Sequence, residues 1–138
     1  MEEFKEAREF GVNPKPVLTG PVTYLLLGKE KEEGFDRMDL IDALLDVYAQ
    51  ILKDLRNEGA EWIQFDEPFL VQDLTEKQKS VYKEVYKKLR EWFPSMNIML
   101  ATYFEGLYDN LNLAVSLPVD ALHLDLVRDP DQLDDVLR

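Results

Sequence analysis

The sequence has no cysteine and only one histidine among its 138 residues. Without cysteine the chain can form neither a disulfide nor a thiolate metal site, and it has no thiol nucleophile. Basic residues are also scarce, since 16 lysines and arginines stand against 28 aspartates and glutamates, a formal net charge of −12. Nucleic acids are bound by clusters of basic side chains, so this balance argues against a nucleic acid partner. The missing cysteine fits a reducing compartment, and we expect a cytoplasmic protein.

Long apolar runs and glycine-rich loops are missing as well. No run approaches the ~20 apolar residues of a transmembrane helix, and the first residues lack the apolar stretch of a signal peptide, so we expect no membrane association. The glycines lie too far apart to cradle a phosphate, and no serine lies in a nucleophile elbow. What remains is 46% hydrophobic and 11% aromatic residues. That is enough apolar mass for the core of one globular unit.

Four stretches rich in β-forming residues are predicted to be strands, each leading towards a helix. They lie at residues 17–19, 61–66, 97–103 and 121–127. The run 22–27 is apolar on every side, so its periodicity does not distinguish a strand from a buried helix.

Helix signals lie between these strands. Asp36 is a predicted N-cap, and apolar residues then recur at intervals of three and four up to Leu55. Thr75 and Gln78 predict a capping box for the next helix. The spacing of its aromatic residues on one face favours core packing of their rings, and these residues are Tyr82, Tyr86, Trp92 and Phe93. A shorter helix is expected around 107–115, and Pro130 is expected at the first position of the last one.

Alternating strands and helices predict an α/β fold of parallel βα units. An open doubly wound sheet could hold four strands. A (β/α)8 TIM-type barrel needs about 250 residues, so this chain would supply only about half of one. The apolar pattern of the last helix is only beginning where the sequence stops, which favours the half barrel over a complete sheet.

Function in either architecture is expected at the carboxyl ends of the strands. Asp66, Glu67 and Asp125 are predicted to point towards the same rim, where they could bind an amine, a cation or a water molecule. The alternative is that these carboxylates cap helices and hold loop amides. His123 alternates with leucines inside a strand, which is more typical of a hydrogen-bonded packing residue than of a base or ligand. These residues make no complete active site.

Three segments together resemble one family. They are residues 15–25 (KPVLTGPVTYL), residues 62–68 (WIQFDEP) and residues 101–106 (ATYFEG), and their order and the intervening helices agree over nearly the whole chain. The chain is similar to the cobalamin-independent methionine synthases, the 5-methyltetrahydropteroyltriglutamate–homocysteine methyltransferases. The first and third strings are specific, whereas the motif Asp-Glu-Pro alone would be weak.

The resemblance implies a parent protein with two (β/α)8 barrels, of which residues 1–138 would form the second half of the N-terminal barrel, a single partial domain. The parent would transfer the methyl group of 5-methyltetrahydropteroyltriglutamate to homocysteine, yielding methionine without cobalamin. It would bind homocysteine and methyltetrahydrofolate polyglutamate, with zinc in the other barrel. The isolated chain is expected to be inactive, because it supplies no thiolate ligand for zinc. It is also expected to self-associate, because a half barrel leaves open sheet edges.

The resemblance also identifies what this chain lacks. The zinc-binding barrel of the family has a His-x-Cys pair where this sequence has Ala101 and Tyr103, so no metal or catalytic residue is expected here. Asp125 matches an acidic zinc ligand of that barrel, and Asp66 matches a position that contacts the amine of homocysteine. Substrate contacts at Asp66, Glu67 and Asp125 are therefore expected to be vestigial, if they are retained.

Two other interpretations remain open at this point. The chain could be a non-catalytic acidic α/β interaction module that binds a basic partner through the acidic faces of its helices. It could also be a metal-dependent hydrolase that uses Asp66, Glu67 and Asp125.

Overall fold

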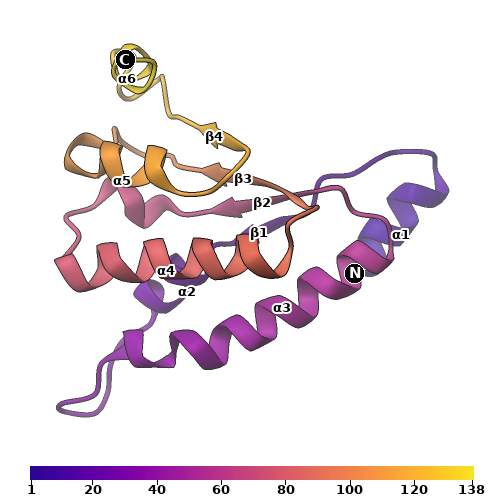
Figure 1. The fold of residues 1–138 in the computed structure, drawn as a ribbon, viewed down its shortest axis with the longest axis horizontal. Helices are drawn as coiled ribbons and strands as arrows, with labels where there is room; N and C mark the ends of the chain where they lie inside the picture. Colours follow the sequence, from indigo (N-terminus) through magenta and orange to yellow (C-terminus); the bar gives the residue numbers. More distant parts are fainter.

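The computed structural model describes Met1–Arg138 and contains one sheet of four strands in the order β1-β2-β3-β4. The strands are β1 (Val17–Thr19), β2 (Trp62–Asp66), β3 (Asn97–Ala101) and β4 (Ala121–His123). Every neighbouring pair is parallel, and each strand is followed by a helix (Figure 1). The predicted α/β class is confirmed, and strands in sequential order are the arrangement of half a (β/α)8 barrel.

The helices occupy the connections between strands. They are α1 (Glu2–Glu9), α2 (Pro21–Leu27), α3 (Ile41–Asn57), α4 (Glu76–Trp92), α5 (Leu111–Ser116) and α6 (Gln132–Val136), with 3-10 turns η1 (Arg37–Leu40), η2 (Pro68–Val71) and η3 (Tyr108–Asn110). The apolar run 22–27 is therefore helical, and Pro21 at its first position suits a helix start. None of these helices is both long and apolar enough to cross a membrane.

Three predicted boundaries are wrong. β3 ends at Ala101 and β4 at His123, earlier than the sequence pattern indicated. The apolar residues beyond these ends belong to loops, where Asp125 binds backbone amides and turns the chain. The last helix begins at Gln132 rather than at Pro130, and Asp131 makes no side-chain cap to it.

The two faces of the sheet differ in burial. On β2, Ile63 and Phe65 are fully buried, whereas Trp62, Gln64 and Asp66 are half-buried. The buried side faces the helices, since the Phe65 ring lies 6.0 Å from that of Tyr48 on α3 and 6.2 Å from that of Tyr86 on α4. Figure 1 shows α3 and α4 on the same side of the sheet. The opposite face, which a closed barrel would turn inward, stays partly open.

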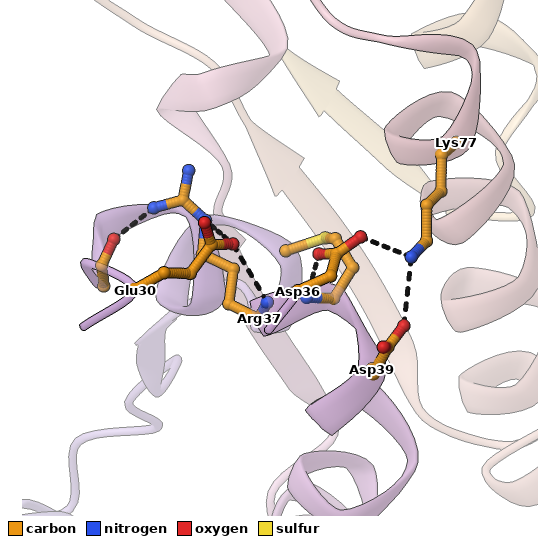
Figure 2. Close-up of polar contacts among 7 residues, drawn as sticks. Glu30, Asp36, Arg37, Asp39 and Lys77 are labelled. Atoms are coloured by element: carbon orange, nitrogen blue, oxygen red, sulfur yellow. Dashed lines mark hydrogen bonds and ion pairs between the residues drawn. The ribbon is translucent and has the colours of Figure 1, made fainter. Parts of the chain in front are cut away.

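The connection between α2 and α3 is tied to the start of α4 by charged groups. Lys77 on α4 pairs with Asp36 and, at 3.0 Å, with Asp39 (Figure 2). Asp36 also accepts the backbone N–H of Met38 at 2.8 Å, so the predicted cap is confirmed, although it caps η1 rather than α3 itself. Arg37 donates its backbone N–H to Glu30 at 3.0 Å and closes the base of the loop.

Candidate functional site

The carboxyl end of β2 lies in the middle of the rim at which the strands end. The strand register places Thr19, Asp66, Ala101 and His123 in one row across the four strands. Thr19 and His123 are exposed and Asp66 is half-buried, whereas Ala101 is buried, so the polar residues of this row lie on the partly open face of the sheet. Its polar members are the groups that a ligand at the rim could reach.

Asp66 is held by a neighbour on its own strand. The Gln64 side chain donates from Nε2 to Oδ1 of Asp66 at 2.7 Å, and Asp66 forms no ion pair with a lysine or arginine. Burial, together with the neighbouring Asp66 carboxylate, raises the pKa of Tyr103 to about 12. The Tyr103 hydroxyl therefore remains protonated at neutral pH, and Asp66 offers a carboxylate that no protein cation neutralises.

Glu67 lies on the opposite side of the sheet from Asp66. Its side chain is fully buried and accepts the backbone N–H groups of Val22 at 3.4 Å and Thr23 at 2.8 Å. The hydroxyls of Tyr82 and Tyr86 donate to it at 3.2 and 3.0 Å. The expectation that all three carboxylates share one rim is wrong for Glu67, because successive side chains at the strand end point to opposite faces.

The burial of Glu67 affects its ionisation. Burial raises the pKa of this carboxyl to about 7, although hydrogen bonds from Thr23, Tyr86 and Val22 favour the ionised form and reduce the shift. The contact with α2 is also close. A Cβ atom on Gly20 would lie 2.1 Å from Cδ of Glu67, so a larger residue here would have to displace the Glu67 side chain.

Asp125 binds the loops that follow β3 and β4. One of its oxygens accepts the N–H of Phe104 at 2.8 Å, and the other accepts those of Val127 and Arg128 at 3.2 and 3.1 Å. The Phe104 hydrogen bond is the main reason why the pKa of Asp125 lies below its usual value. Phe104 has a φ of +86°, a conformation that non-glycine residues rarely adopt, and Asp125 fixes its backbone. Asp125 thus holds loop amides, as the alternative to ligand binding predicted.

His123 is hydrogen-bonded, as the sequence predicted, but it is exposed rather than packed. Its Nδ1 lies 3.0 Å from the carbonyl oxygen of Thr102. A carbonyl can only accept, so Nδ1 donates this hydrogen bond. No three or more histidine, aspartate and glutamate side chains are grouped to hold a metal ion, and the hydrolase interpretation therefore has no metal centre to support it.

The hydroxyl groups of Tyr82 and Tyr86 were missed by sequence reasoning, which assigned both rings to core packing. Both rings are fully buried, so that part of the prediction is confirmed. A buried tyrosine normally needs a partner for its hydroxyl. Two tyrosines four residues apart on the apolar face of a helix were therefore the available signal for a buried acceptor.

Comparison with known proteins gives a match over the whole length of the chain. The family model described as "Cobalamin-independent synthase, N-terminal domain" matches residues 1–138. A protein of Flavobacterium johnsoniae is 58% identical over 137 residues, one of Cytophaga hutchinsonii 55% over 138 and one of Nitrobacter winogradskyi 50% over 136. Each is named 5-methyltetrahydropteroyltriglutamate--homocysteine methyltransferase. The matches cover 99% of this chain but only 18% of each relative.

Proposed function

The chain belongs to the family of the cobalamin-independent synthase N-terminal domain, and we propose that it is part of an enzyme that makes methionine. The parent protein would transfer the methyl group of 5-methyltetrahydropteroyltriglutamate to homocysteine. The observation that carries this proposal is the identity of 58% with an enzyme of that name over 99% of the chain. A non-catalytic interaction module is not favoured, because the similarity to proteins named as methyltransferases covers 99% of the chain.

Within that parent we assign the chain to the second half of the N-terminal barrel. The parallel order β1-β2-β3-β4 supports this assignment. Both outer strands, β1 and β4, have an unpaired side to which further strands of a barrel could add. A closed (β/α)8 barrel would also cover the row that contains the half-buried Asp66 and the exposed His123.

Zinc, if the parent uses it, is proposed to bind outside this chain, because the donor set here does not suit it. Zinc sites of thiol-activating enzymes are built from thiolates and imidazoles, and this chain has no cysteine and one histidine. Ala101 and Tyr103 occupy the strand end where ligands would be needed, and Asp125 gives its oxygens to three backbone amides. No cofactor is proposed for these residues.

Of the three predicted carboxylates we propose that Asp66 alone faces a substrate of the parent enzyme. Asp66 is on the open face, has no cationic partner and accepts a hydrogen bond from the Gln64 side chain. The oxygens of Glu67 and Asp125, in contrast, accept backbone N–H groups of other segments. Replacing Asp66→Asn in the full-length parent should raise KM for one of its two substrates at least 10-fold. The exposed Asp46→Asn is the matched control and should leave KM unchanged. Equal KM values in both variants would contradict the role of Asp66.

The isolated chain is proposed to self-associate in the cytoplasm through the unpaired edge of β1. Val17 on this edge is 51% exposed, and an unpaired strand edge is a template for pairing. Light scattering of the purified chain should give more than the 16.1 kDa of a monomer. A Val17→Lys variant should shift the mass towards the monomer, since an edge lysine opposes pairing. If the isolated chain without substitution is a monomer at micromolar concentration, self-association is contradicted.

The proposed reaction is tested by assaying methionine formation from the two substrates. The full-length parent protein should form methionine without added cobalamin, whereas the 138-residue chain alone should give no more than an enzyme-free blank. A full-length parent that binds neither substrate and forms no methionine would contradict the proposal. Methionine formed by the isolated chain would contradict its role as one part of the enzyme.

A further inference from the structure

A buried carboxylate cluster joins three elements on the helical side of the sheet. It consists of Glu67 after β2, the first-turn amides of Val22 and Thr23 on α2, and the hydroxyls of Tyr82 and Tyr86 on α4. Glu67, Tyr82 and Tyr86 are each 0% exposed. The carboxylate therefore holds the start of α2 against α4 without any contact with water.

Nothing in the cluster carries a positive charge. Glu67 takes part in no ion pair. The titratable groups that act on it are tyrosines: two on α4, Tyr48 on α3 and Tyr103 beyond β3. The segments α2 and η2 present no charged side chain to it, because they comprise PVTYLLL and PFLV. An ionised Glu67 would thus be a buried charge supported only by neutral donors, which is costly.

The cluster is also connected to the rim. The backbone carbonyl of Asp66 accepts the N–H of Gly20 at 2.7 Å, directly before α2 begins. The same helix ends with Leu27, 63% exposed, and carries Tyr24, 56% exposed, at its surface. A change in how firmly α2 is packed would therefore alter the backbone next to Asp66, the residue that we propose to face the substrate.

We propose that Glu67 is a proton-binding latch that sets how firmly α2 is held against β2 and α4. When α2 is in place, Glu67 is enclosed, and when α2 detaches, the carboxyl becomes hydrated. The proton is therefore bound more tightly in the closed form than in the open form. By linkage, a closed form that binds the proton more tightly is favoured at low pH and loses its advantage as pH rises.

The pKa of Glu67 fixes the pH range of this effect. It is about 7 in the closed form, against the ordinary value of 4.5 for a hydrated glutamate. The stabilisation of the closed form by the Glu67 proton is complete below the lower pKa and is lost as pH rises through the higher pKa. Between pH 5 and pH 8 the opening equilibrium constant of α2 should rise by roughly 10- to 100-fold.

Hydrogen exchange of the backbone amides in the 138-residue chain tests the latch. After correction for the intrinsic pH dependence of exchange, the protection of α2 amides should fall by that factor from pH 5 to pH 8. The protection of α3 amides, measured in the same samples, should change less than 3-fold. In a Glu67→Gln variant, which cannot ionise, α2 protection should not depend on pH.

Tyrosine variants keep the test decisive if Glu67→Gln does not fold. Tyr86→Phe removes a donor that favours the ionised form, so it should move the loss of α2 protection to higher pH. The exposed Tyr108→Phe, whose hydroxyl binds Glu105 instead, is the matched control and should leave the pH midpoint unchanged. A wild-type α2 protection that is independent of pH would overturn the latch. An equal fall in α2 and α3 would also overturn it, because that result reports unfolding of the whole chain.

Discussion

Adjacent residues at the end of β2 have opposite environments. Asp66 lies half-buried on the open face, whereas Glu67 is enclosed among tyrosines and helix amides on the other. The sequence placed both carboxylates at a strand end, where function was expected, but it did not separate the two residues. Strand alternation implied that the two carboxylates diverge. The partners of Glu67 were not predictable, since they come from α2 and α4, 44 residues before it and 15 and 19 residues after it.

Gly20 is the residue whose replacement tests the geometry of the buried cluster. Its backbone has φ −63° and ψ 148°, which alanine adopts readily. The cost of Gly20→Ala should therefore come from the clash with Glu67 and amount to about 1–3 kcal/mol in the free energy of unfolding. Denaturant unfolding measures this change.

The same substitution in a Glu67→Ala background provides the control. Because the atoms that the new Cβ would meet belong to Glu67, Gly20→Ala should then cost less than about 0.5 kcal/mol. An undiminished cost in that background would show that the strain at Gly20 has another source.

Elements with strong local signals were predicted well, and elements fixed by tertiary packing were not. Thr75 and Gln78 indicated the start of α4, and both hydrogen bonds of the capping box are present at 3.3 and 2.9 Å. The run 22–27 carried no periodic signal, because the residues on its exposed side, Tyr24 and Leu27, are also apolar. The ends of β3 and β4 were overestimated because apolar loop residues such as Leu126 follow the strand pattern without pairing.

The Thr75 cap should contribute measurably to stability. Thr75→Ala removes an acceptor for the N–H of Gln78 and should lower the free energy of unfolding by about 1 kcal/mol. Thermal or denaturant unfolding of the chain measures it. Ser80→Ala, at an exposed position within the same helix, is the matched control and should be neutral or slightly stabilising, because alanine favours helix. A loss as large in Ser80→Ala would contradict a specific capping effect.

At the scale of the whole molecule, the parallel sheet has helices on one side and a partly open face on the other. The alternation of strands and helices predicted the parallel architecture and its likeness to half a barrel. Sequence reasoning placed Asp66, Glu67 and Asp125 on one rim, although strand alternation already implied that Glu67 points away from Asp66. The contacts of Asp125 with the loops after β3 and β4 were not predictable. The absence of cysteine, which first indicated a reducing compartment, is equally expected of a segment that holds no zinc.

The central claim is that this chain works as one part of a methionine-forming enzyme, and a replacement enzyme tests it most directly. The 137 matched residues of the Flavobacterium johnsoniae methyltransferase are exchanged for this chain, and methionine formation is measured with both substrates at saturation. We predict a kcat within about 10-fold of the unaltered enzyme, which corresponds to a loss of at most about 1.4 kcal/mol in transition-state stabilisation. A folded replacement enzyme that forms no methionine would contradict the account.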